Sequence, residues 1–88
     1  MVTALALTGT NQTAATGPAV YCGYALLADT AAVVRIWDGT SATGTLLDVV
    51  ALADDASANA WYTGGLRAAQ GVFVEVVSGT VSGSVRIG

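Results

Sequence analysis

Six carboxylates, one thiol and a set of aromatic rings are the side chains of this sequence that could take part in chemistry. The absence of histidine and lysine excludes Ser-His-Asp triads, Cys-His pairs, Walker phosphate loops and Schiff-base chemistry. Two carboxylates could in principle hydrolyse a glycoside. However, four of the six lie in or beside predicted turns, where Asp is common for conformational reasons: Asp29, Asp38, Asp54 and Asp55. The sequence therefore predicts a protein that is not an enzyme.

Metal and cofactor sites receive equally little support from the residue types and their spacing. Asp38 with Thr40, or Asp54 with Asp55, could bind calcium, but the spacing of a calcium-binding loop is missing. Cys22 is the single cysteine, so it has no partner for an intrachain disulfide and no soft co-ligand for zinc. It alternates with apolar neighbours, which predicts a small buried hydrophobe. We expect no metal and no cofactor.

The aromatic side chains allow two interpretations. Rings exposed together on a β-sandwich could form a platform for sugar. Alternatively, they could fill the core or a subunit interface, which we favour because large aromatics dominate interface energetics. The residues concerned are Trp37, Trp61, Tyr62 and Phe73, with Tyr21 and Tyr24 beside them in the sequence pattern.

Short extended segments joined by Gly, Asp, Ser and Thr turns must position all of these side chains. Runs of alternating or β-branched residues predict strands at residues 3–8, 19–28, 32–37, 45–53, 60–63, 66–69, 72–78 and 81–87. No segment has convincing helical periodicity. Seven or eight short strands at regular spacing are typical of a β-sandwich or small barrel. We predict an all-β fold, a small antiparallel, jelly-roll-like β-sandwich.

Irregular points within this pattern carry further expectations. Gly23 in mid-strand predicts a β-bulge or the close approach of another backbone segment. A bulge near Asp48 would also repair the imperfect alternation of residues 45–53. Gly64-Gly65 should break the strand pattern after Tyr62, and residues 53–59 read as a polar turn. Ser78-Gly79-Thr80 predicts a tight hairpin between the last two strands. Its core side would hold Val74, Val76, Val85 and Ile87, and its outer side would place Glu75 beside Arg86.

The N-terminal region divides from the rest by composition. Residues 1–17 carry no charge and end at Gly17-Pro18, so we predict an arm or first strand plus linker, followed by a β-sandwich domain at 18–88. An uncharged, flexible arm is suited to adding a strand to the edge of another protein. The residues predicted to dock are Thr3, Ala4, Leu5, Ala6 and Leu7.

The overall composition predicts self-association. Of the 88 residues, 53% are hydrophobic and 10% charged, whereas a soluble domain usually carries about 25% charged residues. Too few charges remain to coat a monomer, unless Thr, Ser, Gly and Ala provide its polar surface. The net charge is −3, and three scattered arginines cannot form a nucleic-acid footprint or a basic membrane-surface helix. No apolar run approaches the ~20 residues of a membrane-spanning helix.

The segment from Arg35 to Ile87 resembles short virion proteins of tailed bacteriophages, especially phages of actinobacteria. The resemblance lies in RIWDGT at 35–40, ATGT at 42–45, LL at 46–47, VALA at 50–53, the pair Trp61-Tyr62, GVFVEV at 71–76 and SGTVSGSV at 78–85. These segments are typical of turns and strands and contain no catalytic motif, so the resemblance assigns no catalytic residue to this chain.

What the resemblance implies is a structural role. Proteins that look like this are capsid decoration or minor head proteins, and related β-sandwich proteins cap the capsid surface as trimers. The implied partners are the major capsid protein and further copies of the chain. The implied location is the exterior of a virion assembled in the host cytoplasm. The alternative function is a carbohydrate-binding module on the virion or tail that recognises the host surface.

Overall fold

The fold is an eight-stranded β-sandwich, as the alternating pattern predicts. A computed structural model describes residues 2–88; Met1, the first residue of the predicted arm, lies outside the described residues. The strands are β1 (Thr3–Ala6), β2 (Gln12–Ala15), β3 (Ala19–Ala28), β4 (Ala32–Asp38), β5 (Thr45–Leu52), β6 (Ser57–Ala68), β7 (Val72–Ser78) and β8 (Val81–Ile87). Residues 2–88 contain no helix long and apolar enough to cross a membrane.

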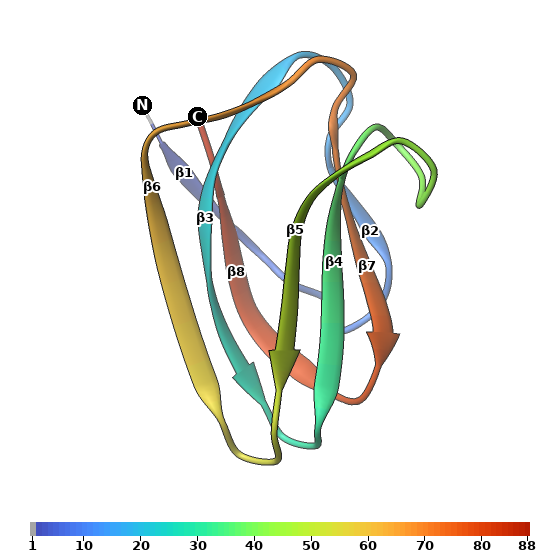
Figure 1. The fold of residues 1–88 in the computed structure, drawn as a ribbon, viewed down its shortest axis with the longest axis vertical. Coiled ribbons are helices and arrows are strands. Elements are labelled where there is room, and N and C mark those ends of the chain that lie inside the picture. Colours follow the sequence, from blue (N-terminus) through green and yellow to red (C-terminus); the bar gives the residue numbers. More distant parts are fainter. Residues whose placement is uncertain (1) are drawn as a thin grey trace.

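Two four-stranded antiparallel sheets pack face to face (Figure 1). Sheet A has the order β1-β8-β3-β6, and sheet B has the order β2-β7-β4-β5. Every connection except that between β4 and β5 passes from one sheet to the other. This is the strand order of a jelly roll, in which alternate strands contribute to opposite layers. The all-β sandwich prediction is therefore confirmed.

The core lies between the sheets and consists of small and β-branched side chains around one large ring. Tyr21, Val34, Ile36, Val72, Val74 and Val85 are the largest fully buried side chains. Val76 and Ile87 are partly buried and pack against this cluster. The predicted inward faces of β7 and β8 are thus correct, because period-two alternation fixes which side chains share a face.

Both predicted bulges are present. The register of β3 shifts between Tyr21 and Gly23 against both of its neighbours, and Gly23 has a φ of 135°. A Cβ at Gly23 would collide with the carbonyl oxygen of Ala60, so only glycine fits. In the β4–β5 pair, Ile36 faces Asp48 and Trp37 faces Leu46, which leaves Leu47 as the extra residue. The second bulge turns Asp48 inward.

The bulge in β3 also changes the reason for the burial of Cys22. The thiol is buried, as predicted. However, the register shift places Tyr21 with Tyr24 and Leu26 in the core, and Cys22 is not part of that cluster. Its sulfur lies near Gly65 and Gly88 instead. The prediction that Cys22 is buried is therefore correct. The reason given for it, strict alternation with Tyr24 and Leu26, is wrong.

The N-terminal segment belongs to both sheets. Leu5 of β1 pairs with Val85 of β8, and Gln12 of β2 pairs with Val74 of β7. The linker expected over residues 9–17 therefore contains a strand. Its Thr, Ala and Gln side chains lack the apolar alternation that marks the other strands, because β2 is a short edge strand with one neighbour.

The predicted hairpin between β7 and β8 is wrong. The two strands lie in different sheets, and Ser78-Gly79-Thr80 crosses between them. Thr80 is held by residues of the β3–β4 connection: its amide donates to Thr30 Oγ1 at 2.9 Å, and its carbonyl accepts from the Asp29 amide at 2.9 Å. Alternation shows which side chains are buried, but it does not show which strand lies alongside.

Strand β6 is longer than the two pieces predicted at residues 60–63 and 66–69. It runs through Gly64 and Gly65 and begins within the predicted polar turn. The expected disruption at the glycines is nevertheless present, because Gly23 pairs with Trp61 whereas Tyr21 pairs with Leu66. Residues 62–65 therefore form an irregular excursion, which brings Tyr62 to the open side of the sandwich.

Candidate interaction surface

The structure separates the four aromatic residues that the sequence singled out. Trp37 and Phe73 are cross-strand partners of β4 and β7, and both lie on the outer face of sheet B. Trp61 lies on the outer face of sheet A with 57% of its surface exposed. Tyr62 turns inward and packs against the core. Only Trp37 and Phe73 therefore share a surface.

The outer face of sheet B is apolar across three strands. We define the sheet B face as Val33, Arg35, Trp37, Leu46, Val49, Ala51, Phe73, Glu75 and Val77. Three of these are large hydrophobic side chains with high exposure, namely Leu46 at 42%, Val49 at 51% and Val77 at 45%. Contiguous exposed apolar side chains of this kind mark interaction sites on soluble proteins.

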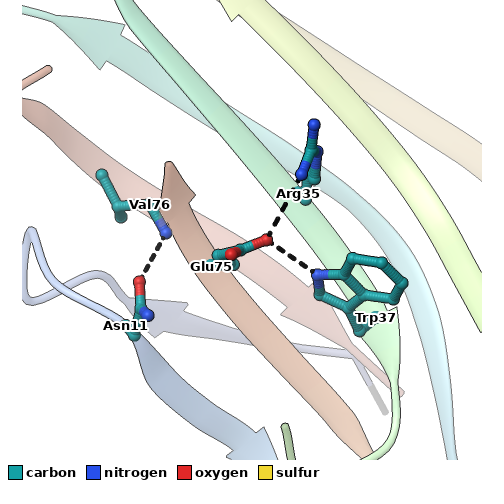
Figure 2. Close-up of polar contacts among 5 residues, drawn as sticks. All are labelled: Asn11, Arg35, Trp37, Glu75 and Val76. Carbon is teal, nitrogen blue, oxygen red and sulfur yellow. Dashed lines mark hydrogen bonds and ion pairs between the residues drawn. The ribbon is translucent and has the colours of Figure 1, made fainter. Parts of the chain in front are cut away.

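One cation and one anion lie near the centre of this face. Arg35 on β4 and Glu75 on β7 are direct cross-strand partners, and Arg35 Nη1 is 4.0 Å from Glu75 Oε1. The same carboxylate oxygen accepts a hydrogen bond of 3.1 Å from Trp37 Nε1 (Figure 2). Glu75 therefore orients the indole ring. The side chain of Arg35 remains 44% exposed, so this exposed ion pair contributes little to the stability of the monomer.

The segment before β2 is attached to the same part of sheet B. The Asn11 side-chain oxygen accepts a hydrogen bond of 2.8 Å from the backbone amide of Val76 (Figure 2). Because β2 is an edge strand, this contact fixes its entry onto β7. The Asn11 side chain thus holds the edge strand β2 against β7, one of the strands that carry the sheet B face.

A second polar cluster closes the open side of the sandwich between β5 and β6. Asp48 Oδ2 accepts hydrogen bonds from the hydroxyl groups of Tyr21 at 3.0 Å and Tyr62 at 2.6 Å. The Val49 amide donates to Asp48 Oδ1 at 3.0 Å. The two tyrosine rings are 5.9 Å apart between centroids. Two residues of sheet A therefore bind one carboxylate of sheet B.

The acid–base properties of this cluster suit structure rather than catalysis. Burial, followed by the charge of Asp48, raises the pKa of Tyr21. The hydrogen bond to Asp48, followed by burial, raises the pKa of Tyr62 to about 12. A catalytic base or nucleophile needs a pKa tuned toward the working pH, whereas these phenols are kept protonated. They act as permanent hydrogen-bond donors to Asp48.

Two of the turn carboxylates, Asp38 and Asp54, hold loops together. Asp38 accepts from the backbone amides of Ala69 at 3.1 Å and Gln70 at 2.9 Å, and these hydrogen bonds hold its pKa below the usual range. Asp54 accepts from the Ala31 amide at 2.6 Å. Neither candidate calcium pair gains further acidic partners: residues 2–88 contain no group of three or more His, Cys, Asp or Glu able to hold a metal ion.

The predicted docking residues form the edge of sheet A. Thr3, Ala4, Leu5 and Ala6 are in β1, paired on one side with β8 and open on the other. Leu7 continues this contact, since its amide donates to the Gly83 carbonyl at 2.9 Å. Leu5 and Leu7 pack partly against the core. Docking through this segment therefore would use the open edge of a strand that already belongs to the sandwich.

A cavity of about 330 Å³ lies at the end of sheet A, lined by Pro18, Ala19, Val20, Arg67 and Gly88. Arg67 is its single charged residue, and no second polar side chain converges on it. No residue pattern predicted this cavity, and the sheet B face is the stronger candidate for an interaction site.

Comparisons with known proteins gave no family for the chain: no family model, curated protein or solved structure matches it.

Proposed function

We propose that this chain is a non-catalytic structural protein that binds the outside of a tailed-bacteriophage capsid as a homo-oligomer and reinforces it. The observation that carries this proposal is the sheet B face, an apolar surface that would support self-association, on a small β-sandwich with very few charges. The resemblance of residues 35–87 to phage decoration proteins supplies the identity of the shell. The resemblance also implies a trimer, which remains the sequence-based expectation for the number of copies.

Cementing is the mechanism that suits such a module. A rigid oligomer that contacts several capsid subunits makes each later contact intramolecular, which raises its effective concentration. Several weak contacts with the shell then act together as one strong attachment. The sandwich suits this role because its closely packed core transmits strain between its faces.

Host-sugar recognition is the alternative function. It requires aromatic rings exposed together on one face. Trp61 lies on the opposite sheet from Trp37 and Phe73, and Tyr62 donates its hydroxyl to Asp48. Of the four rings, only the Trp37–Phe73 pair could therefore serve one sugar, so the arrangement favours the structural role.

Imaging of purified particles of the phage that encodes the chain tests the proposal. We expect density for the sandwich at repeated positions on the capsid surface. Particles that lack the protein should lose their contents at a lower temperature, and added purified protein should restore their resistance. Density restricted to the tail tip, together with binding to host glycans, would support the alternative. Particles without the protein that are as heat-resistant as the parent would contradict a reinforcing role.

A further inference from the structure

The outer side chains of the two central strands of sheet B form a self-complementary pattern. Strand β4 presents Val33, Arg35 and Trp37, while β7 presents Val77, Glu75 and Phe73. In the observed register, Trp37 lies opposite Phe73 and Arg35 opposite Glu75. Val33 lies opposite Ser78, and the register shift between Val33 and Val34 leaves Val77 as the extra residue next to this pair. Two rows therefore join side chains of matching chemistry, aromatic with aromatic and cation with anion, and the third brings an aliphatic side chain of β7 near Val33.

We propose that this face binds a second copy of the chain across a two-fold axis that runs between β4 and β7, parallel to the strands. Such an axis places β4 of one copy over β7 of the other without changing the row. Arg35 then meets the second copy's Glu75, Trp37 meets Phe73, and Val33 meets Val77. An isologous interface needs a patch that is complementary to itself, and this patch meets that condition in its aromatic and its charged row.

Charge complementarity identifies the occupant. Arg35 can donate five hydrogen bonds, and its contact with Glu75 is at the 4.0 Å limit of an ion pair. Glu75 uses Oε1 for both Arg35 and Trp37. A wholly apolar partner would bury both charges without adding a hydrogen bond, which is costly. A second copy supplies a carboxylate for each guanidinium and a guanidinium for each carboxylate.

The size of the face sets the expected strength. Three strands spaced about 4.8 Å apart and seven residues rising about 3.4 Å each give a face of about 340 Å² per copy. Two such faces bury less than a standard protein–protein interface, which covers about 1,600 Å² in total. We therefore expect a dimer that dissociates on dilution through the micromolar range. This inference rests on the self-association part of the proposed function, and it predicts two copies where the resemblance implies three. It is independent of the capsid.

Charge reversal with mixing gives the decisive test. Arg35→Glu alone would stack four negative charges in the dimer, and Glu75→Arg alone would stack four positive ones. Each variant should be monomeric at concentrations where the parent dimerises. An equimolar mixture of the two should recover the dimer, because every charge in the mixed pair again meets its opposite. The double variant Arg35→Glu/Glu75→Arg on one chain should dimerise as the parent does.

Sedimentation and native mass spectrometry of the purified full chain measure these outcomes, and thermal melting checks that each variant is folded. Arg86→Glu, on the outer face of sheet A, is the matched control and should leave the dimer unchanged. Val77→Ser adds no charge to an exposed position and should weaken dimerisation by about tenfold or more, since each dimer loses two apolar contacts.

Three results would overturn the proposal: a parent chain that is monomeric at every concentration, a trimer, or single variants whose mixture stays monomeric. None of these results bears on capsid binding, which particle imaging decides separately. A dimer formed by the parent and by the mixture, but by neither single variant, would establish the sheet B face as the interface.

Discussion

At the scale of single residues, Asp48 is the polar side chain on which the closure of the sandwich depends. It accepts from phenols on β3 and β6 while belonging to β5, so it joins the two sheets. A partly buried carboxylate needs such partners, because leaving a polar group unpaired away from water costs more than a typical hydrogen bond contributes. The bulge that turns Asp48 inward therefore stabilises the fold only while both tyrosines donate to it.

Tyr62→Phe tests this cluster without removing the ring. We expect the free energy of unfolding to fall by about 1–2 kcal/mol, because the variant removes one hydrogen bond to a charged group at a partly exposed position. Denaturant titration at neutral pH measures the loss. Tyr24→Phe is the control, since within the described residues the Tyr24 hydroxyl makes no hydrogen bond to Asp48. Equal losses from the two variants would show that the contact with Asp48 contributes nothing specific.

The same cluster predicts alkaline sensitivity. Tyrosine in the unfolded chain ionises near pH 10, whereas the pKa of Tyr62 in the fold is about 12. The stabilisation is therefore complete below about pH 10 and is lost as the pH rises through about 12, because the unfolded state releases its proton first. Tyr62→Phe should show a shallower decline across this window than the parent. If the free energy of unfolding of the variant fell in parallel with that of the parent, Tyr62 would not contribute to the loss of stability at alkaline pH.

At the scale of elements, the sequence predicted strands and their faces well but predicted their neighbours poorly. Strands β3, β7 and β8 have the predicted bounds, and the inward side of β7 and β8 is correct. The local pattern contains this information, because the side-chain period of a strand is two. The partner of a strand depends on contacts between distant segments. The Ser78-Gly79-Thr80 turn fits a hairpin and a crossover between sheets equally well.

For the sheet B face, too, the sequence predicts which side chains share a face of a strand but not which strands are neighbours. Period-two alternation alone puts Arg35 on one face with Val33 and Trp37, and Glu75 on one face with Phe73 and Val77. What the sequence did not reveal is that these two strands are neighbours. Glu75 was expected beside Arg86, and its actual partner Arg35 lies 40 positions earlier in the chain. The surface became visible only once the β4–β7 pairing was known.

Deleting residues 2–8 tests whether β1 is part of the sandwich or a detachable arm. We expect the variant to lose about 2–5 kcal/mol of stability, because Leu5 and Leu7 leave the core and the edge of β8 is exposed. Thermal melting measures the loss, and hydrogen exchange should increase at β8. The double substitution Ala4→Ser/Ala6→Ser keeps the strand and changes exposed positions, so it should be nearly neutral. An undiminished melting temperature after deletion would instead identify the segment as an arm.

At the scale of the whole molecule, the contacts of the few charged side chains show why little charge is left for the outer surface. Asp38 and Asp54 hold loops, Asp48 holds two tyrosines, and Arg35 and Glu75 bind each other. Many of the few charged side chains thus interact with other groups of the same chain. The rest of the outer surface depends on the polar side chains of Ser, Thr and Asn for solvation, and the sheet B face as defined contains none of these. Binding of a second copy, as proposed above, would remove that face from water.

Self-association and shell binding should therefore be coupled through avidity. If the homo-oligomer reinforces the capsid, a monomeric variant has one footprint where the parent has several, and its apparent affinity for the shell should fall by about 10²-fold. Arg35→Glu provides the monomer, and Arg35→Glu/Glu75→Arg provides a matched oligomer with the same composition of charge. Binding of both to shells that lack the protein, measured by co-sedimentation over a range of concentrations, gives the comparison. The double variant should bind as the parent does. Equal binding by the single variant would mean that each copy holds the shell alone and that cementing by an oligomer is the wrong mechanism.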